Sequence, residues 1–129
     1  MPVLKYLTDT NIVSDYFRPG NPVKDWFAQH RGQIGISTLT LAEMRRGIEL
    51  KADPKTRAKL ERTYDFILED YQEAIFVFDE AAAAESRDAL PPYDDSLIAA
   101  IARSSGLTVI TRNEKHFSGV ATVNPWKLK

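Results

Sequence analysis

Short, continuous runs of apolar residues alternate with longer amphipathic segments along most of the chain. The apolar runs contain many β-branched residues and do not alternate with polar ones. This pattern is typical of strands that are buried on both faces of a parallel sheet. We predict strands at Val3–Thr8, Ile34–Ser37, Ala74–Phe78, Thr108–Thr111 and, as a short last strand, Ala121–Val123.

The segments between these runs have helical periodicity. In the longest segment, Leu60, Tyr64, Ile67 and Leu68 form one apolar stripe, and Gly106 is a predicted helix C-cap. We predict helices at Asn11–Phe17, Val23–His30, Thr40–Lys51, Pro54–Tyr71, Glu80–Ala89 and Tyr93–Ser104. Strands that alternate with helices predict an α/β fold, a three-layer α/β/α sandwich with a mostly parallel sheet of four to five strands.

Length and composition narrow the class of protein. A chain of 129 residues is expected to form a single domain over residues 1–129, and 43% hydrophobic with 27% charged residues is typical of a soluble globular protein. No apolar segment is long enough to cross a membrane. Cysteine is absent, which excludes disulfides and thiolate metal sites and suggests a cytoplasmic location. The net charge of −1 argues against a general nucleic-acid coat protein but is compatible with a nuclease.

Acidic residues occur where the predicted strands end. Asp9 follows the first strand, Glu43 lies in the first turn of the helix after the second, and Asp94 and Asp95 open the helix before the fourth. Each has a purely structural explanation: Asp9 as a helix N-cap, Thr40 to Glu43 as a capping box, and Asp94 or Asp95 as a cap. However, the carboxyl ends of parallel strands share one edge of the sheet, where ligands bind. We therefore expect the acids to converge.

Converging carboxylates suggest a metal site. Crowded carboxylates disfavour joint ionisation, and a divalent cation relieves their repulsion. Ligands that are all oxygens suit Mg²⁺, or Mn²⁺ as a second choice. The two histidines, His30 and His116, are far apart in the sequence and suggest no competing site. Helical periodicity places both Asp94 and Asp95 over apolar residues, so it does not choose between them.

Several segments, in order, resemble the PIN-domain toxins of the VapC family. Leu7 to Ser14 (LTDTNIVS) resembles the family's opening motif, and Asp95 to Ala102 (DSLIAAIA) resembles its third acidic motif. The other matching segments are 38–49, 108–113 with Phe117, and 124–126. The resemblance covers nearly the whole chain, and five motifs in order are far more specific than one.

The resemblance implies a magnesium-dependent endoribonuclease with a parallel five-stranded sheet. Asp9, Glu43 and Asp95 match the family's acidic triad, which is catalytic and binds the metal, so the resemblance selects Asp95 over Asp94. It also implies an RNA substrate, a homodimer, and an antitoxin protein that blocks the site. A larger toxin–antitoxin assembly would bind DNA through the antitoxin.

Other matched positions have supporting roles. By resemblance, Asn11 supports the first acid, Thr10 lines the site, and Thr111, Arg112 and Asn113 belong to the fourth motif. Arg112 is a candidate contact for the scissile phosphate, with a solvated surface base as the alternative.

The fourth motif departs from the family pattern. Family members often carry an acid at the position of Asn113 or at that of His116, and this chain has neither. We count Asn113 among the catalytic positions because it belongs to the fourth motif. Because neither position is acidic, we expect a second metal ion to bind weakly.

Two other functions are considered. A phosphotransfer enzyme or receiver domain has a similar α/β design, but Asp9-Thr10-Asn11 lacks the second acid of a haloacid-dehalogenase motif. Asp79 could act as a phospho-acceptor, but no lysine at a strand end accompanies it, and we interpret it as a helix N-cap. A non-catalytic domain with an acidic metal-binding pocket is the other alternative, against which the intact triad argues.

Overall fold

The computed structural model describes residues 3–117 and 119–127. In these residues the strands form one parallel sheet with the order β3-β2-β1-β4-β5. The strands are β1 (Tyr6–Thr8), β2 (Ile34–Ser37), β3 (Ile75–Phe76), β4 (Thr108–Ile110) and β5 (Thr122–Val123). All the predicted strands are present, and the predicted parallel sheet is confirmed. Only β2 has its predicted bounds, because the apolar runs extend beyond the paired residues of the other strands.

The predicted helices also form. They are α1 (Thr10–Tyr16), α2 (Val23–Gln29), α3 (Thr38–Glu49), α4 (Pro54–Asp70), α5 (Glu80–Glu85) and α6 (Tyr93–Ser105). A short 3₁₀ helix, η1 (Glu114–Phe117), was not predicted. The predicted helix over Glu80–Ala89 is too long, since α5 ends at Glu85.

Carboxylate caps set the start of three helices. The side chains of Asp9, Asp53 and Asp79 accept hydrogen bonds from the backbone N–H groups of Ile12, Thr56 and Ala82, at 2.9, 3.0 and 3.0 Å. Such caps satisfy an N–H group that has no partner within the helix. The interpretation of Asp79 as an N-cap is therefore confirmed.

The structure excludes two of the capping alternatives. Helix α3 begins at Thr38, and Ser37 Oγ accepts from the Thr40 backbone N–H at 3.1 Å, so Thr40 and Glu43 do not form a capping box. Glu43 consequently lies in the second turn of the helix. Helix α6 follows Pro92 without a side-chain cap, so Asp94 and Asp95 lie in its first turn without capping it.

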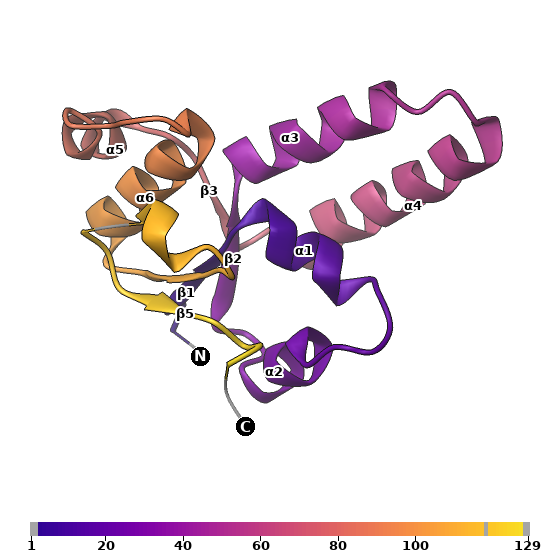
Figure 1. The fold of residues 1–129 in the computed structure, drawn as a ribbon, viewed down its shortest axis with the longest axis horizontal. Helices are drawn as coiled ribbons and strands as arrows, with labels where there is room; N and C mark the ends of the chain where they lie inside the picture. Colours follow the sequence, from indigo (N-terminus) through magenta and orange to yellow (C-terminus); the bar gives the residue numbers. More distant parts are fainter. Residues whose placement is uncertain (1–2, 118, 128–129) are drawn as a thin grey trace.

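Helices cover both faces of the sheet (Figure 1). Ile98, Ile101 and Ala102 of α6 pack with Leu7 of β1 and Val109 of β4 on one face. Helices α1 to α4 pack on the other face, in the clusters around Ile12 and Trp26 and around Ile36 and Ile67. The three-layer α/β/α sandwich is confirmed. In the described residues, no helix combines the length and apolar character needed to cross a membrane.

The register of the central strand aligns the strand ends. Thr8 pairs with Ile36 of β2 and with Ile110 of β4. The residues that follow, including Asp9 and Thr111, therefore emerge at the same edge of the sheet.

Gly35 tests how closely β2 packs against β3 and the residue before it. A Cβ atom at Gly35 would lie 2.5 Å from Phe76 Cε2 and 3.0 Å from the Ala74 carbonyl oxygen. We expect Gly35→Ala to lower the free energy of unfolding by about 1–3 kcal/mol, because overpacking forces neighbours to move. Gly47→Ala is the matched control: it lies within α3, where an added Cβ would meet no atom within 4 Å apart from its chain neighbours and the backbone of its own helix, and it should raise stability by about 1 kcal/mol. Urea unfolding measures both, and equal effects would contradict the close approach.

Candidate active site

Asp9 is a buried carboxylate at the end of β1. Its side chain is held at both oxygens: Oδ1 accepts from the Ile12 backbone N–H at 2.9 Å, and Oδ2 accepts from Thr111 Oγ1 at 2.6 Å. Asp9 is only 2% exposed, and this burial raises its pKa to about 6. The charge of Asp95 contributes to this rise, while the two hydrogen bonds and Arg112 reduce it. The structure thus gives this acid an environment that opposes its ionisation.

Glu43 approaches the same edge from α3. Its Oε1 accepts from Thr10 Oγ1 at 2.8 Å, and the Thr10 hydroxyl also lies 3.2 Å from Thr40 Oγ1. Burial raises the pKa of Glu43, and the negative charges of Asp94 and Asp95 add to the rise. Thr10 therefore orients the second acid, which fits its predicted place at the site.

Asp95 lies in the first turn of α6 and pairs with a histidine. Its Oδ2 is 2.8 Å from His116 Nδ1, on η1. The neighbouring Asp94 instead lies 3.9 Å from Arg46 Nη2, with both side chains largely exposed. Asp95 raises the pKa of both Asp9 and Glu43. Asp94 also raises the pKa of Glu43, but within this pair only Asp95 contributes to the raised pKa of Asp9.

The end of β4 is tied to Asp9 through Thr111. This threonine is fully buried; its hydroxyl donates to Asp9 and accepts from the Asn113 backbone N–H at 2.9 Å. Asn11 is exposed on α1. The supporting contacts of Asp9 that the structure shows come from Ile12 and Thr111.

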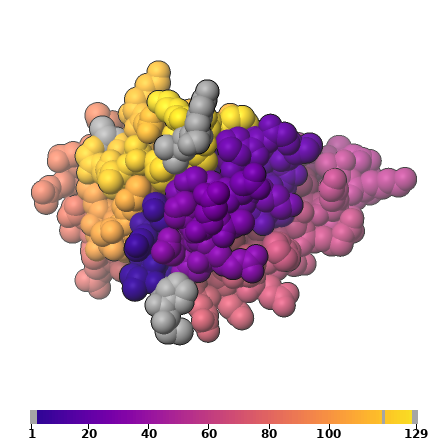
Figure 2. Space-filling view, turned by 90° about the horizontal axis from the view of Figure 1, so that it is seen from below, coloured from indigo at the N-terminus to yellow at the C-terminus, as the bar shows by residue number. Residues whose placement is uncertain are grey.

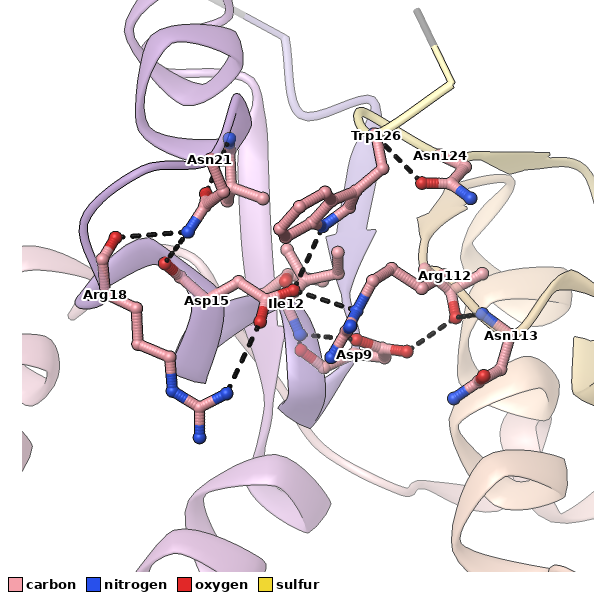
Figure 3. A network of polar contacts seen from close by, with 12 residues as sticks. Asp9, Ile12, Asp15, Arg18, Asn21, Arg112, Asn113, Asn124 and Trp126 are labelled. Atoms are coloured by element: carbon pink, nitrogen blue, oxygen red, sulfur yellow. Dashed lines mark hydrogen bonds and ion pairs between the residues drawn. The ribbon is translucent and has the colours of Figure 1, made fainter.

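A second polar cluster lies beside Asp9 (Figure 3). Arg112 Nε lies 2.9 Å from Asp15 Oδ2, and Trp126 Nε1 donates to the same oxygen at 3.1 Å. Sequence reasoning missed Asp15 and Trp126 as neighbours of the site. The available signal was an acid at Asp15 on the same helical stripe as Ile12, an apolar face on which a solvated acid is unusual.

The acids fit a divalent cation by their chemistry. Asp9, Glu43 and Asp95 offer only oxygen atoms, and negative neighbours disfavour ionisation of Asp9 and Glu43, a conflict that a cation removes. In the described part of the chain, no group of three or more His, Asp or Glu side chains already lies close enough together to hold a metal ion. Each carboxylate is engaged by a protein partner instead: Asp9 by Thr111, Glu43 by Thr10 and Asp95 by His116.

Comparison with known proteins identifies the family. Residues 6–123 match the family described as PIN domain. The chain belongs to the PIN-domain family. This PIN domain is 30% identical to the tRNA(fMet)-specific endonuclease VapC of Shigella flexneri, over 92% of this chain and 93% of the relative.

Solved structures share the fold over nearly the whole chain. The crystal structure of FitAcB from Neisseria gonorrhoeae matches this PIN domain with a TM-score of 0.85 and 33% identity, covering 95% of this chain and 99% of that one. A toxin–antitoxin complex from Klebsiella pneumoniae matches with a TM-score of 0.73 and 28% identity, covering 96% of this chain and 100% of that one. The PIN-like fold that the sequence motifs imply is therefore confirmed.

The raised pKa of Asp9 predicts that the substitution Asp9→Asn stabilises the fold by an amount that depends on pH. The folded chain holds the Asp9 proton up to about pH 6, whereas the unfolded chain releases it near pH 3.8. Stability is therefore lost as the pH rises through this window, by a total on the order of 3 kcal/mol. Asp9→Asn removes this cost and keeps a good N-cap. In EDTA, we expect this variant to melt above the wild type at pH 7.5 and to lose most of that gain at pH 4.

A matched control separates the charge from the cap. Asp53 is an N-cap that likewise accepts from the backbone N–H three residues on, but it is exposed and its hydrogen bonds to Thr56 lower its pKa. Asp53→Asn should therefore give no gain at pH 7.5. A pH-independent change in the Asp9→Asn melting temperature would contradict the assignment of an ionisation cost to Asp9.

Proposed function

We propose that this PIN domain is a metal-dependent endoribonuclease that cleaves RNA phosphodiester bonds with water. The observation that carries the proposal is the placement of Asp9, Glu43 and Asp95, which come from three different elements to one edge of the sheet, where the charge of Asp95 raises the pKa of both other acids. The relative from Shigella flexneri is named an endonuclease, which supports the reaction class.

The proposed cofactor is Mg²⁺, with Mn²⁺ as an alternative. Asp9, Glu43 and Asp95 would hold it, and the bound ion supplies a water of lowered pKa and compensates charge on the phosphoryl oxygens. Asn113 is neutral, and His116 is engaged with Asp95. The fourth position therefore adds no negative charge, and a second ion would depend on phosphate and water for its ligands.

The other residues orient these acids. Thr111 and the Ile12 backbone fix the two oxygens of Asp9, Thr10 fixes Glu43, and His116 fixes Asp95. Attack of water on phosphorus, in line with the departing 3′ oxygen, leaves a 5′-phosphate and a 3′-hydroxyl. Arg112, which follows Thr111, is the candidate contact for the phosphate.

We further propose that the nuclease is the toxin of a toxin–antitoxin pair in the cytoplasm. The Klebsiella pneumoniae structure is described as a toxin–antitoxin complex, and the family resemblance implies a homodimer and a DNA-binding assembly through the antitoxin. An antitoxin could insert a basic side chain among the acids, because their mutual repulsion favours a cation of any kind.

Neutralisation of the acids tests the nuclease. We expect Asp95→Asn and Asp9→Asn to retain the fold but to reduce cleavage of a single-stranded RNA transcript by at least about a hundredfold. Each variant removes a negative charge from a metal site that would lower the activation free energy by several kcal/mol. EDTA should abolish cleavage, and Mg²⁺ or Mn²⁺ should restore it. Gel analysis of the cleaved RNA measures these effects.

The control is the neighbouring acid. Asp94→Asn changes the net charge equally. Its side chain faces Arg46 and its charge raises the pKa of Glu43, but it is not one of the three proposed metal ligands, so we expect a loss of activity far smaller than a hundredfold. Cleavage that persists in EDTA would exclude a metal-dependent enzyme. Metal binding without cleavage would instead favour a non-catalytic acidic domain.

Expression in bacteria tests the toxin role. We expect the wild-type protein alone to arrest growth and co-expression of a small protein from the neighbouring gene to restore it. The Asp95→Asn variant, expressed to the same level, should be harmless. Colony counts after induction measure the effect, and identical growth with wild type and variant would exclude a nuclease toxin.

A further inference from the structure

Asp15 is a buried acid that lies outside the acidic group. It is on α1, is 2% exposed, and is contacted by residues from both ends of the chain. Its Oδ2 lies 2.9 Å from Arg112 Nε and accepts from Trp126 Nε1 at 3.1 Å, while Oδ1 lies 3.9 Å from Arg18 Nη1. Figure 2 shows the C-terminal residues beside the N-terminal ones on one face of the molecule, as these contacts require. Burial of a carboxylate is costly unless polar or charged partners surround it, and Asp15 has such partners.

Arg112 connects this cluster to the acids. It directly follows Thr111, whose hydroxyl is bonded to Asp9, and its positive charge lowers the pKa of Asp9. The Arg112 side chain is nevertheless 42% exposed. Its guanidinium is therefore close enough to Asp9 to affect it and still open to solvent.

The contacts of Arg112 leave part of its guanidinium for a ligand. Asp15 engages Nε, whereas the two terminal nitrogens carry four further N–H donors. Trp126 covers the cation from one side, with its ring centroid 5.5 Å from Arg112 Cζ. A guanidinium held in this way can present a fixed pair of donors, which suits the oxygens of a phosphate.

We propose that Asp15 and Trp126 are positioning residues that hold the Arg112 guanidinium beside the acids, where it binds one phosphate of the RNA. The proposal rests on the nuclease function above and adds to it the anchor of the arginine. The C-terminal turn that carries Trp126 then belongs to the site as well as to the fold.

A double-mutant cycle separates positioning from a general structural role. The enzyme is assayed with Mg²⁺ or Mn²⁺ on an end-labelled oligoribonucleotide that spans a site cut in a long single-stranded transcript. We expect Asp15→Asn and Arg112→Ala each to lower kcat by on the order of ten- to a hundredfold. In the Arg112→Ala background, Asp15→Asn should cause no further loss, because its partner is already absent.

Two further variants keep the test decisive. Arg18→Gln removes the other, 69% exposed cation near Asp15 and should change kcat by less than twofold. Trp126→Phe retains an aromatic ring but removes the indole N–H, so it should lower kcat without unfolding the chain. Thermal unfolding of every variant shows whether the folded fraction is intact, and Trp126→Phe replaces Asp15→Asn in the cycle if the latter does not fold.

RNA binding in EDTA provides a readout that does not depend on cleavage. Loss of one phosphate contact to single-stranded RNA should reduce the slope of log affinity against log salt by about 0.7. We expect this reduction for Arg112→Ala and for Asp15→Asn, and no further reduction in the double variant.

The outcomes distinguish this proposal from the nuclease function. An inactive wild type with either metal would overturn the nuclease, while the salt slopes would still test the anchored arginine. The positioning role is overturned if the wild type is active and Asp15→Asn lowers kcat by the same factor in the Arg112→Ala background as in the wild-type background. Unchanged kcat and salt slope in Arg112→Ala would exclude the phosphate contact.

Discussion

The arrangement of the acidic edge depends on the register of β1 between its two neighbours. Because Thr8 pairs with both Ile36 and Ile110, the chain leaves three central strands at the same level. Asp9 and Thr111 therefore meet, although they are 102 residues apart, and are joined by a hydrogen bond of 2.6 Å. A one-residue slip of β4 would turn Thr111 to the other face and remove this bond.

The same edge concentrates charge at a cost to the fold. Asp9 caps α1 and is buried at the start of that helix, where the N–H groups favour a negative charge. Even so, burial dominates and raises its pKa to about 6. Asp9 thus stabilises the helix by its oxygen and destabilises the domain by its charge. A residue selected for stability alone would cap the helix without carrying the buried charge. A charge that is kept although it destabilises the domain is typical of sites selected for chemistry.

The elements and the acids could be predicted because their signals are local. Continuous apolar runs located the strands, and Asp9 could be placed because it directly follows one. The start of α3 could not be predicted, because Ser37 and Thr40 are both good caps and only the structure shows that the helix follows β2 directly. Periodicity also could not separate Asp94 from Asp95, which differ in whether they face Arg46 or His116.

The pairing of distant residues left little trace in the sequence. Asp15 and Trp126 are 111 residues apart, and their contact follows from the position of β5 and the C-terminal turn at the edge of the sheet. The proximity of His116 to Asp95 likewise depends on η1, a single turn with no apolar periodicity that could predict it. Such contacts result from the topology, so they can be identified only when the order of the strands in the sheet is known.

Charge balance shows how an acidic site is compatible with the proposed polyanionic substrate. The negative charges of Asp9, Glu43 and Asp95 would repel phosphate unless positive charge lay close by. The chain places such charge at the border: Arg46 near Asp94, and Arg112 against Asp15. Each arginine lies near an acid outside the triad, and under the proposed function the triad would bind the cation while the arginines would contact phosphate. A net charge of −1 for the whole chain is therefore compatible with RNA binding, because local placement of charge, and not its sum, determines what this edge attracts.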